Sequence, residues 1–337
     1  MSHGIGAQPR FRLAALPTPL HELPNLREEL GGDRRCPRIL IKRDDLTGLA
    51  FGGNKARKLE FLVGDALRER ATVLVTTGAV QSNHARMTAA AACVAKMKCV
   101  LVLTSDTESP AIQGNLLLDK LLGAEIHFIA PNPDPRIATG DQEAARVAEV
   151  MDDLKRRGER PYLIPVGGSS ATGALGYITG TLELTTQLFQ NGESPSRLYY
   201  ANGSRGTQAG LALGAKMYSA PYQIHGIAVS GGEPEKTERA LRIANQAAET
   251  LGVTTRIDAQ DLRNDESYIG PGYGIATPAS TEAIQLLART EGIFLDPVYT
   301  AKAMAGMIDH IRRGAIDPAE TVVFLHSGGT PALFAHA

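Results

Sequence analysis

A lysine and a group of small polar residues stand at two points of the chain where a strand is expected to end and a helix to begin. The first point is Gly52-Gly53-Asn54-Lys55 and the second is Gln81-Ser82-Asn83-His84. Other cations stand near this lysine in the sequence: Lys42, Arg57 and Lys58. Like charges disfavour a protonated amine, so we expect Lys55 to be partly neutral. A neutral lysine amine can form a Schiff base with a carbonyl compound.

A third loop has the composition of an anion site. Asn202-Gly203-Ser204-Arg205-Gly206-Thr207 follows an expected strand at 197–201 and precedes a helix near Gln208. Small residues allow backbone N–H groups to approach a phosphate, and the Ser204 and Thr207 hydroxyls add donors. Glycine-rich turns are also common without any ligand. The loop lacks the Gly-Lys-Ser/Thr ending of a nucleotide P-loop and the full GxGxxG pattern, which disfavours ATP and NAD.

Short β-branched runs alternate with helical-period segments, a pattern typical of an α/β fold with parallel sheets covered by helices. Strands are expected at 38–42, 72–77, 99–103, 125–129, 162–164, 197–201, 223–229 and 321–325. Helices are expected from about Asn54, at 83–96, near 114–122 and at 141–157, with a turn-rich loop at 131–135. A Gly/Ser-rich break at 165–170 separates two series of strands, so we place a domain junction there.

Composition narrows the class of function. The chain has 337 residues, 43% of them hydrophobic, and a formal net charge of −1, which fits two domains and does not favour a nucleic-acid or membrane surface. It lacks a signal-peptide pattern and an apolar run long enough to span a membrane, so we expect a cytoplasmic protein. The three cysteines lack CxxC or Cys/His spacing, so the sequence predicts no metal site. Small-molecule chemistry is the best expectation.

Five motifs follow one another along the chain: 52–60, 81–84, Gly270-Pro271-Gly272-Tyr273-Gly274, 295–299 and 326–334. Together they resemble the D-cysteine desulfhydrase and 1-aminocyclopropane-1-carboxylate (ACC) deaminase family, and the resemblance covers nearly the whole chain. The resemblance implies a fold-type-II pyridoxal 5′-phosphate enzyme of the tryptophan synthase β type, usually a homodimer. It implies a large domain formed by 1–55 and 165–337, a small domain formed by 56–164, and the cofactor in the cleft between them.

The resemblance also assigns roles to single residues. Lys55 corresponds to the lysine that forms the Schiff base with the cofactor and later moves the α-proton of the substrate. Lys58 would contact the cofactor phosphate together with the loop residues Gly203, Ser204, Arg205, Gly206 and Thr207. Asn83 would bind the phenolic oxygen of the cofactor. Ser82, Asn83 and His84 would hold the substrate carboxylate, although Ser82 or Asn83 could instead simply cap a helix.

Two tyrosines, Tyr273 and Tyr299, match family residues that flank the substrate, where they would act in acid/base chemistry or orientation. Asp296 and His326 are expected to be mainly structural. ACC deaminases carry a glutamate and a leucine where this chain has Thr300 and Ser327. A hydroxyl partner at the pyridine nitrogen makes the cofactor a weaker electron sink, which suffices for β-elimination but not for opening a cyclopropane.

The resemblance therefore implies α,β-elimination from D-cysteine. The alternative is L-cysteate sulfo-lyase, and ACC deaminase is a weaker one. Arg205 departs from the small residue usual at its position, and it could face the cofactor phosphate, an anionic substrate group or solvent. A non-catalytic binding protein is the remaining alternative, disfavoured because Lys55, Ser82, Tyr273 and Tyr299 are all present.

Overall fold

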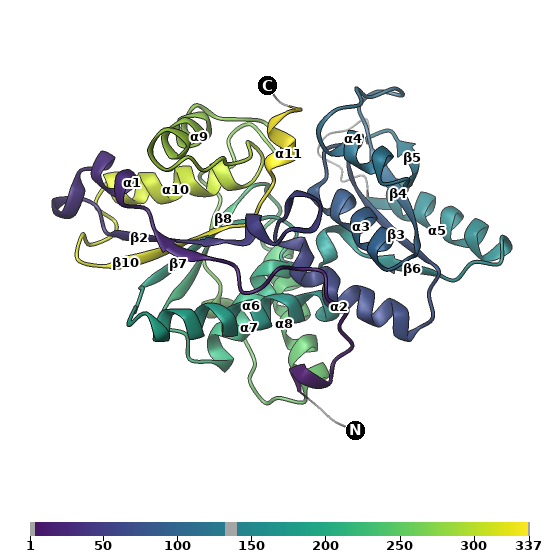
Figure 1. Ribbon diagram of the computed structural model, residues 1–337, viewed down its shortest axis with the longest axis horizontal. Coiled ribbons are helices and arrows are strands. Elements are labelled where there is room, and N and C mark those ends of the chain that lie inside the picture. Colours follow the sequence, from purple (N-terminus) through teal and green to yellow (C-terminus); the bar gives the residue numbers. More distant parts are fainter. Residues whose placement is uncertain (1–3, 132–139, 336–337) are drawn as a thin grey trace.

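The computed structural model describes residues 4–131 and 140–335, which form two lobes, each built on a twisted sheet (Figure 1). The larger sheet has six strands in the order β1-β2-β10-β7-β8-β9. Only β1 is antiparallel to its neighbour. The strands are β1 (Leu20–Glu22), β2 (Arg38–Arg43), β10 (Thr321–His326), β7 (Arg197–Asn202), β8 (Gln223–Ala228) and β9 (Asn264–Asp265).

The smaller sheet has four parallel strands in the order β5-β4-β3-β6. They are β5 (Glu125–Ile129), β4 (Lys98–Thr104), β3 (Val73–Ala79) and β6 (Pro161–Ile164). Valines alternate with larger apolar residues along β3 and β4, so one face of the sheet packs on α5 and the other on α2, α3 and α4. This two-sided burial is characteristic of parallel sheets.

Helices cover both faces of each sheet. They are α1 (Pro24–Glu29), α2 (Lys55–Arg68), α3 (Asn83–Val94), α4 (Gly114–Leu121), α5 (Gly140–Arg156), α6 (Ala171–Gln190), α7 (Gly206–Met217), α8 (Glu235–Leu251), α9 (Pro278–Glu291), α10 (Thr300–Arg312) and α11 (Thr330–Leu333). Among the helices described in 4–131 and 140–335, none is long and apolar enough to cross a membrane.

The large sheet is buried on both sides because successive residues of β7 point to opposite faces. Leu198 and Tyr200 pack into the core formed with α6, α7 and α8. Tyr199 and Ala201 belong to the other core, formed with α1, α9 and α10. Figure 1 shows these two helix layers on either side of the sheet.

The strand order brings distant loops together. β10 lies between β2 and β7, and all three strands are parallel. Their carboxyl ends therefore meet at one edge of the sheet, where ligands bind in open α/β folds. One bond fixes this meeting directly, since the backbone N–H of Asn54 donates to the carbonyl of Ser327 at 2.9 Å.

All eight expected strands are present, with ends that differ by at most two residues. Strands β1 and β9 were not predicted, because they have only three and two residues and thus no periodicity to detect. The loop expected at 131–135 falls, from residue 132 onward, outside the described residues. We propose the domain division 1–55 with 165–337, and 56–164, because β2 pairs in the large sheet while β3 to β6 form the small one.

Candidate active site

A cavity of about 270 Å³ is lined by loops from both sheets. From the large sheet come the residues after β7 and β10. From the small sheet come the residues after β3, including Ser82, Asn83 and His84. Lys55, Tyr273 and Tyr299 also line this cavity, so the fold brings the main predicted site residues together.

Lys55 is the first residue of α2 and lies half-buried at the cavity wall. Its Nζ donates to Oδ1 of Asn54 at 2.9 Å. Burial, followed by the positive charge of Arg86, lowers the pKa of Lys55 to about 8, while the carboxylate of Asp296 opposes this shift. A substantial fraction of this amine is therefore neutral near physiological pH.

The pKa of Lys55 is lowered, as expected, but the expected repulsion by Lys42 and Arg57 is not the cause. Lys42 and Arg57 lie in a buried ion-pair network with Asp44 and Glu183, in which Arg57 contacts both carboxylates at 2.8 Å. These charges are neutralised within the network. The repelling cation is instead Arg86, which sequence distance did not reveal.

The Gly52-Gly53 turn sets the entry into α2. Gly52 has φ 71°, and a Cβ there would lie 1.9 Å from the carbonyl oxygen of Asp45, so only glycine fits. Gly53 is held on both sides by Thr47, whose hydroxyl accepts from its N–H at 2.8 Å and donates to its carbonyl at 2.9 Å. The turn thus delivers Lys55 to the cavity.

The loop 203–207 forms a cup at the start of α7. Ser169 donates to the Ser204 hydroxyl at 2.8 Å, and Thr207 accepts from Asn54 at 3.2 Å. A Cβ on Gly206 would lie 2.7 Å from Oγ of Ser169, so the backbone packs too closely for a side chain. Helix N-terminal amides in such a cup are suited to an anion.

Lys58 lies beneath this cup and is buried. Its Nζ donates to the carbonyl of Gly167 at 3.0 Å and would be 3.0 Å from a Cβ on Gly206. Burial, together with Lys55, lowers the pKa of Lys58 well below its usual range. An anion in the cup would favour the protonated form of Lys58 and offset the cost of its burial.

Arg205 does not face solvent, so that alternative is wrong. Its side chain is fully buried, pairs with Glu233 and donates to Oδ1 of Asn264 at 3.0 Å. The residue has φ 72°, a left-handed backbone conformation that is unusual for a residue with a side chain. The guanidinium is held by Glu233 and Asn264, and Arg205 is also one of the residues that line the cavity.

Ser82 caps α3, which was the alternative to a substrate-binding role for this residue. Its Oγ accepts from the N–H of Ala85 at 3.1 Å. His84 bonds through Nε2 to the Thr76 hydroxyl at 2.9 Å, and that hydroxyl donates to Ile164 at 2.7 Å. Nε2 of His84 is therefore the protonated nitrogen. Its Nδ1 is an acceptor with no partner among the described residues.

Asn83 has a fixed orientation. Its Oδ1 accepts from Arg86 and from Asn115, each at 3.1 Å. Because both bonds use the oxygen, the amide N–H groups of Asn83 remain available as donors at the cavity. Arg86 also donates to Gly52 at 3.0 Å, so one buried guanidinium links the turn before α2 to the start of α3.

Tyr273 and Tyr299 share a hydrogen bond between their hydroxyls. Their rings are 5.8 Å apart and nearly perpendicular. Burial, together with Tyr273, raises the pKa of Tyr299 well above its usual range. Lys302 holds the Tyr273 loop by donating to the carbonyls of Ile269 at 2.6 Å and Gly272 at 2.8 Å.

Asp296 caps α10, in keeping with its expected structural role. It accepts backbone bonds from Val298, Tyr299 and Thr300. The Thr300 hydroxyl donates to Asp296 at 2.7 Å and does not line the cavity, whereas Ser327 does. His326 is also scaffold, since it bonds to Phe294 and Gly328.

Comparison with known proteins decides the family. A model of the family described as pyridoxal-phosphate dependent enzymes matches residues 11–328. The chain belongs to this family. It is 41% identical over 338 residues to D-cysteine desulfhydrases of Salmonella choleraesuis and Salmonella typhi, covering 99% of this chain and 98% of each relative.

Solved structures agree with this assignment to the pyridoxal-phosphate dependent enzymes. A crystal structure of an ACC deaminase homologue has 38% sequence identity and a TM-score of 0.86, covering 98% of this chain and 95% of that one. Threonine deaminase isoform 2 from Solanum lycopersicum has 19% identity and a TM-score of 0.66, covering 96% and 82%, and supports the fold alone.

The residues present fit the cofactor of this family. The buried Nζ of Lys58, which an anion would protonate, and the close-packed Gly206 suit a phosphate group. The Lys55 amine suits an aldehyde, and the free amide donors of Asn83 suit a phenolic oxygen. The Ser327 hydroxyl, at the cavity wall, would be the partner of the pyridine nitrogen of the cofactor.

Several cavity residues were missed in the sequence analysis. Arg86 stands one helical turn after Asn83, and this spacing was a usable signal. Lys236 and Arg239 line the cavity from α8, and Glu233 pairs with Arg205. These three lie in a region without any recognised motif, so only the fold could reveal them.

Proposed function

We propose that the chain is a D-cysteine desulfhydrase that converts D-cysteine and water to pyruvate, sulfide and ammonium. One observation carries the proposal. A lysine with a lowered pKa stands at the start of α2, at the cavity wall, in a chain 41% identical over its length to D-cysteine desulfhydrases.

The bound cofactor supplies an electron sink for the pair of electrons left when the α C–H bond of the amino acid breaks. Lys55 accepts that proton at Nζ, for which its lowered pKa is suited. The β C–S bond then breaks, and its electron pair leaves with sulfur. The enamine released is hydrolysed by water to pyruvate and ammonium.

The substrate carboxylate would be held at the start of α3. Ser82 keeps its hydroxyl proton available because the bond from Ala85 uses only the oxygen lone pair. Asn83 offers amide donors, and His84 contributes its backbone N–H, since Nδ1 of its side chain is an acceptor. Tyr273 and Tyr299 would orient the substrate from the opposite side.

The competing activities have less support. L-cysteate was attractive if Arg205 pointed at a sulfonate, but its guanidinium pairs with Glu233 and Asn264. ACC ring opening would need an acidic partner for the pyridine nitrogen, whereas Ser327 lines the cavity. We also propose that the protein is a homodimer, as the family resemblance implies, and that it is cytoplasmic, as the lack of a signal-peptide pattern indicates. Light scattering tests the first proposal and cell fractionation tests the second.

A keto-acid assay with separate substrates tests the proposal. We expect pyruvate and sulfide from D-cysteine, and little product from L-cysteate or ACC. Lys55→Ala should reduce turnover by about 10³-fold or more, because it removes both the covalent link and the base. Lys120→Ala, which changes an exposed lysine of α4, is the matched control. Sulfite from L-cysteate or 2-oxobutyrate from ACC as the preferred product would overturn the assignment.

A further inference from the structure

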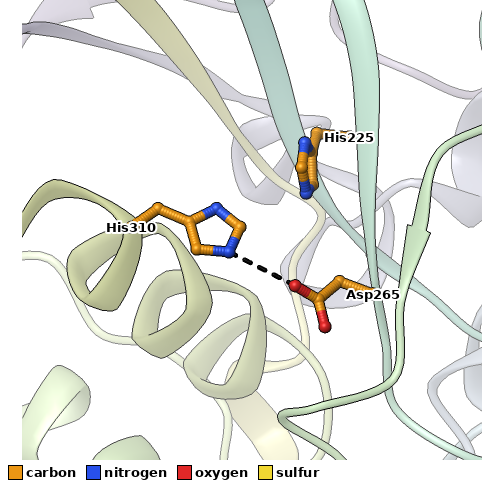
Figure 2. Close-up of side chains that lie close together, drawn as sticks. All are labelled: His225, Asp265 and His310. Carbon is orange, nitrogen blue, oxygen red and sulfur yellow. Dashed lines mark hydrogen bonds and ion pairs between the residues drawn. The ribbon is translucent and has the colours of Figure 1, made fainter. Parts of the chain in front are cut away.

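Two histidines and an aspartate meet on the α10 side of the large sheet. His225 is on β8, Asp265 on β9 and His310 on α10, and Figure 2 shows their side chains directed toward one another. Their ligand atoms all lie within 4.8 Å of one another. None of the three lines the catalytic cavity. The sequence did not reveal this group because the residues are far apart in the chain.

Hydrogen bonds already hold His310 and Asp265 beside each other. Nε2 of His310 lies 3.2 Å from Oδ2 of Asp265, and its Nδ1 lies 2.9 Å from the hydroxyl of Tyr199. Oδ1 of Asp265 accepts from the N–H of Ser267 at 2.9 Å, which leaves Oδ2 directed to the cluster.

His225 is the member that hydrogen bonding does not explain. Within 4–131 and 140–335 its ring nitrogens have no hydrogen-bond partner, and the ring stacks on Tyr199 at 4.8 Å. It lies edge-on to the ring of His310 at 5.1 Å. An imidazole without a hydrogen-bond partner, beside another imidazole and a carboxylate, is free to act as a third ligand.

We propose that His225, Asp265 and His310 bind a divalent transition-metal ion of the zinc class, with water completing its shell. Two imidazoles and one carboxylate are a usual ligand set for such ions. Binding requires the ligand atoms to approach to roughly 3.3 Å from one another, as Zn–N distances of about 2.0–2.1 Å dictate. Side-chain rotation can supply this movement because His225 and Asp265 are only half-buried, which also gives the ion a route of entry.

The residues around the proposed metal site orient one of its ligands but also place positive charges near the ion. With Nε2 of His310 on the metal, its Nδ1–H donates to Tyr199, the usual arrangement for a ligating histidine. Nearby arginines, Arg197, Arg263 and Arg313, oppose a cation, whereas Asp309 favours it. We therefore expect moderate affinity rather than the very tight binding of an all-cysteine site.

The metal would be structural. Asn264, next to Asp265, accepts from Arg205 of the cofactor cup, and α10 begins beside Tyr299. The ion would thus tie β9 to α10 at a distance from the reacting atoms. Occupancy should raise Tm by about 5 °C at a zinc concentration a hundredfold above Kd and leave kcat within twofold.

Zinc binding to the substrate-free holoenzyme tests this proposal. The protein is stripped with a chelator and dialysed to equilibrium against zinc, and the zinc bound per chain above the dialysate concentration and the Tm in that buffer are measured. His225→Gln is the decisive variant, because it removes a ligand without breaking a hydrogen bond of the described chain. His225→Gln should bind one zinc fewer per chain than the parent. Zinc should not raise its Tm above its own metal-free value, which the lost ring stacking on Tyr199 lowers by itself.

The control separates this site from adventitious binding. His21→Gln, which changes an exposed histidine, combined with Cys93→Ser, should retain zinc as the parent does. Equal zinc content in the parent and His225→Gln, or zinc lost only from the control variant, would overturn the proposal. Failure of the parent to bind zinc above background would leave the cluster as a hydrogen-bonded group only and would equally refute it.

Discussion

Nζ of Lys55 donates a 2.9 Å hydrogen bond to Oδ1 of the residue before it, Asn54. The amide nitrogen of Asn54 in turn donates to Thr207 in the cofactor cup. One side chain therefore links the reactive amine to the proposed phosphate site. The orientation of the amine depends on this link.

Asn54→Ala should lower kcat for D-cysteine about tenfold and change KM less, because the amine loses its positioning partner while the carboxylate site stays intact. Steady-state kinetics measure both constants. Asn25→Ala, which removes a side-chain bond to Thr290 far from the cavity, should behave as the parent. An unchanged kcat in Asn54→Ala would show that the link has no role in catalysis.

The lowered pKa of Lys55 predicts how cofactor-free protein recaptures pyridoxal phosphate. Only the neutral amine attacks the aldehyde, so the rate should rise with pH and level off above about 8. An ordinary lysine would keep rising toward 10.5. Stopped-flow absorbance at a series of pH values gives this curve.

Arg86 provides the control for that experiment. Its charge contributes to the lowering, after burial, so Arg86→Gln should move the midpoint of the curve upward. A midpoint that moves downward, or a parent curve that still rises at pH 10, would contradict the assigned cause.

The tyrosine pair should act as a unit. Tyr273→Phe and Tyr299→Phe each remove the shared hydroxyl bond, so each should reduce kcat/KM by about tenfold and the double variant should lose little more. A double-mutant cycle measures the coupling. Tyr218→Phe, on a half-buried tyrosine away from the cavity, is the control. Fully additive losses would mean that the two hydroxyls act separately.

Glu233 should matter to cofactor binding although it bears no motif. Glu233→Gln leaves the buried Arg205 guanidinium without its carboxylate, which we expect to cost about 1–2 kcal/mol of stability, since Glu233 is partly exposed. Pyridoxal phosphate affinity should fall severalfold. Urea unfolding and equilibrium titration provide the measurements. Glu235→Gln, an exposed change nearby, should alter neither property.

The sequence predicted those parts of the site that depend on local order. Lys55 at the start of a helix and the cup at 203–207 follow from neighbours in the chain, and both line the cavity. The prediction that Lys42 and Arg57 lower the pKa of Lys55 was wrong because it overlooked an ion pair between residues far apart in the chain. Glu183 neutralises Arg57 from 126 residues away, and no local pattern reports such a pairing.

Other features depended on side-chain direction or on very short elements. Thr300 stands where the family resemblance implied a cofactor contact, yet its hydroxyl turns to Asp296 four residues earlier. Asn264 lies on a strand of two residues and still accepts the bond from Arg205. Neither orientation nor pairing of this kind is encoded in hydrophobic periodicity.

The position of β10 has a consequence for how the protein is made. This strand lies between β2 and β7, although about 280 residues separate it from β2 in the chain. Strands β3 to β6 are contiguous, so their sheet can form while the ribosome is still translating. The large sheet must wait, with its β2 and β7 edges unpaired, until residues 321–326 emerge. Nascent chains of this protein should therefore depend on chaperones late in synthesis rather than early.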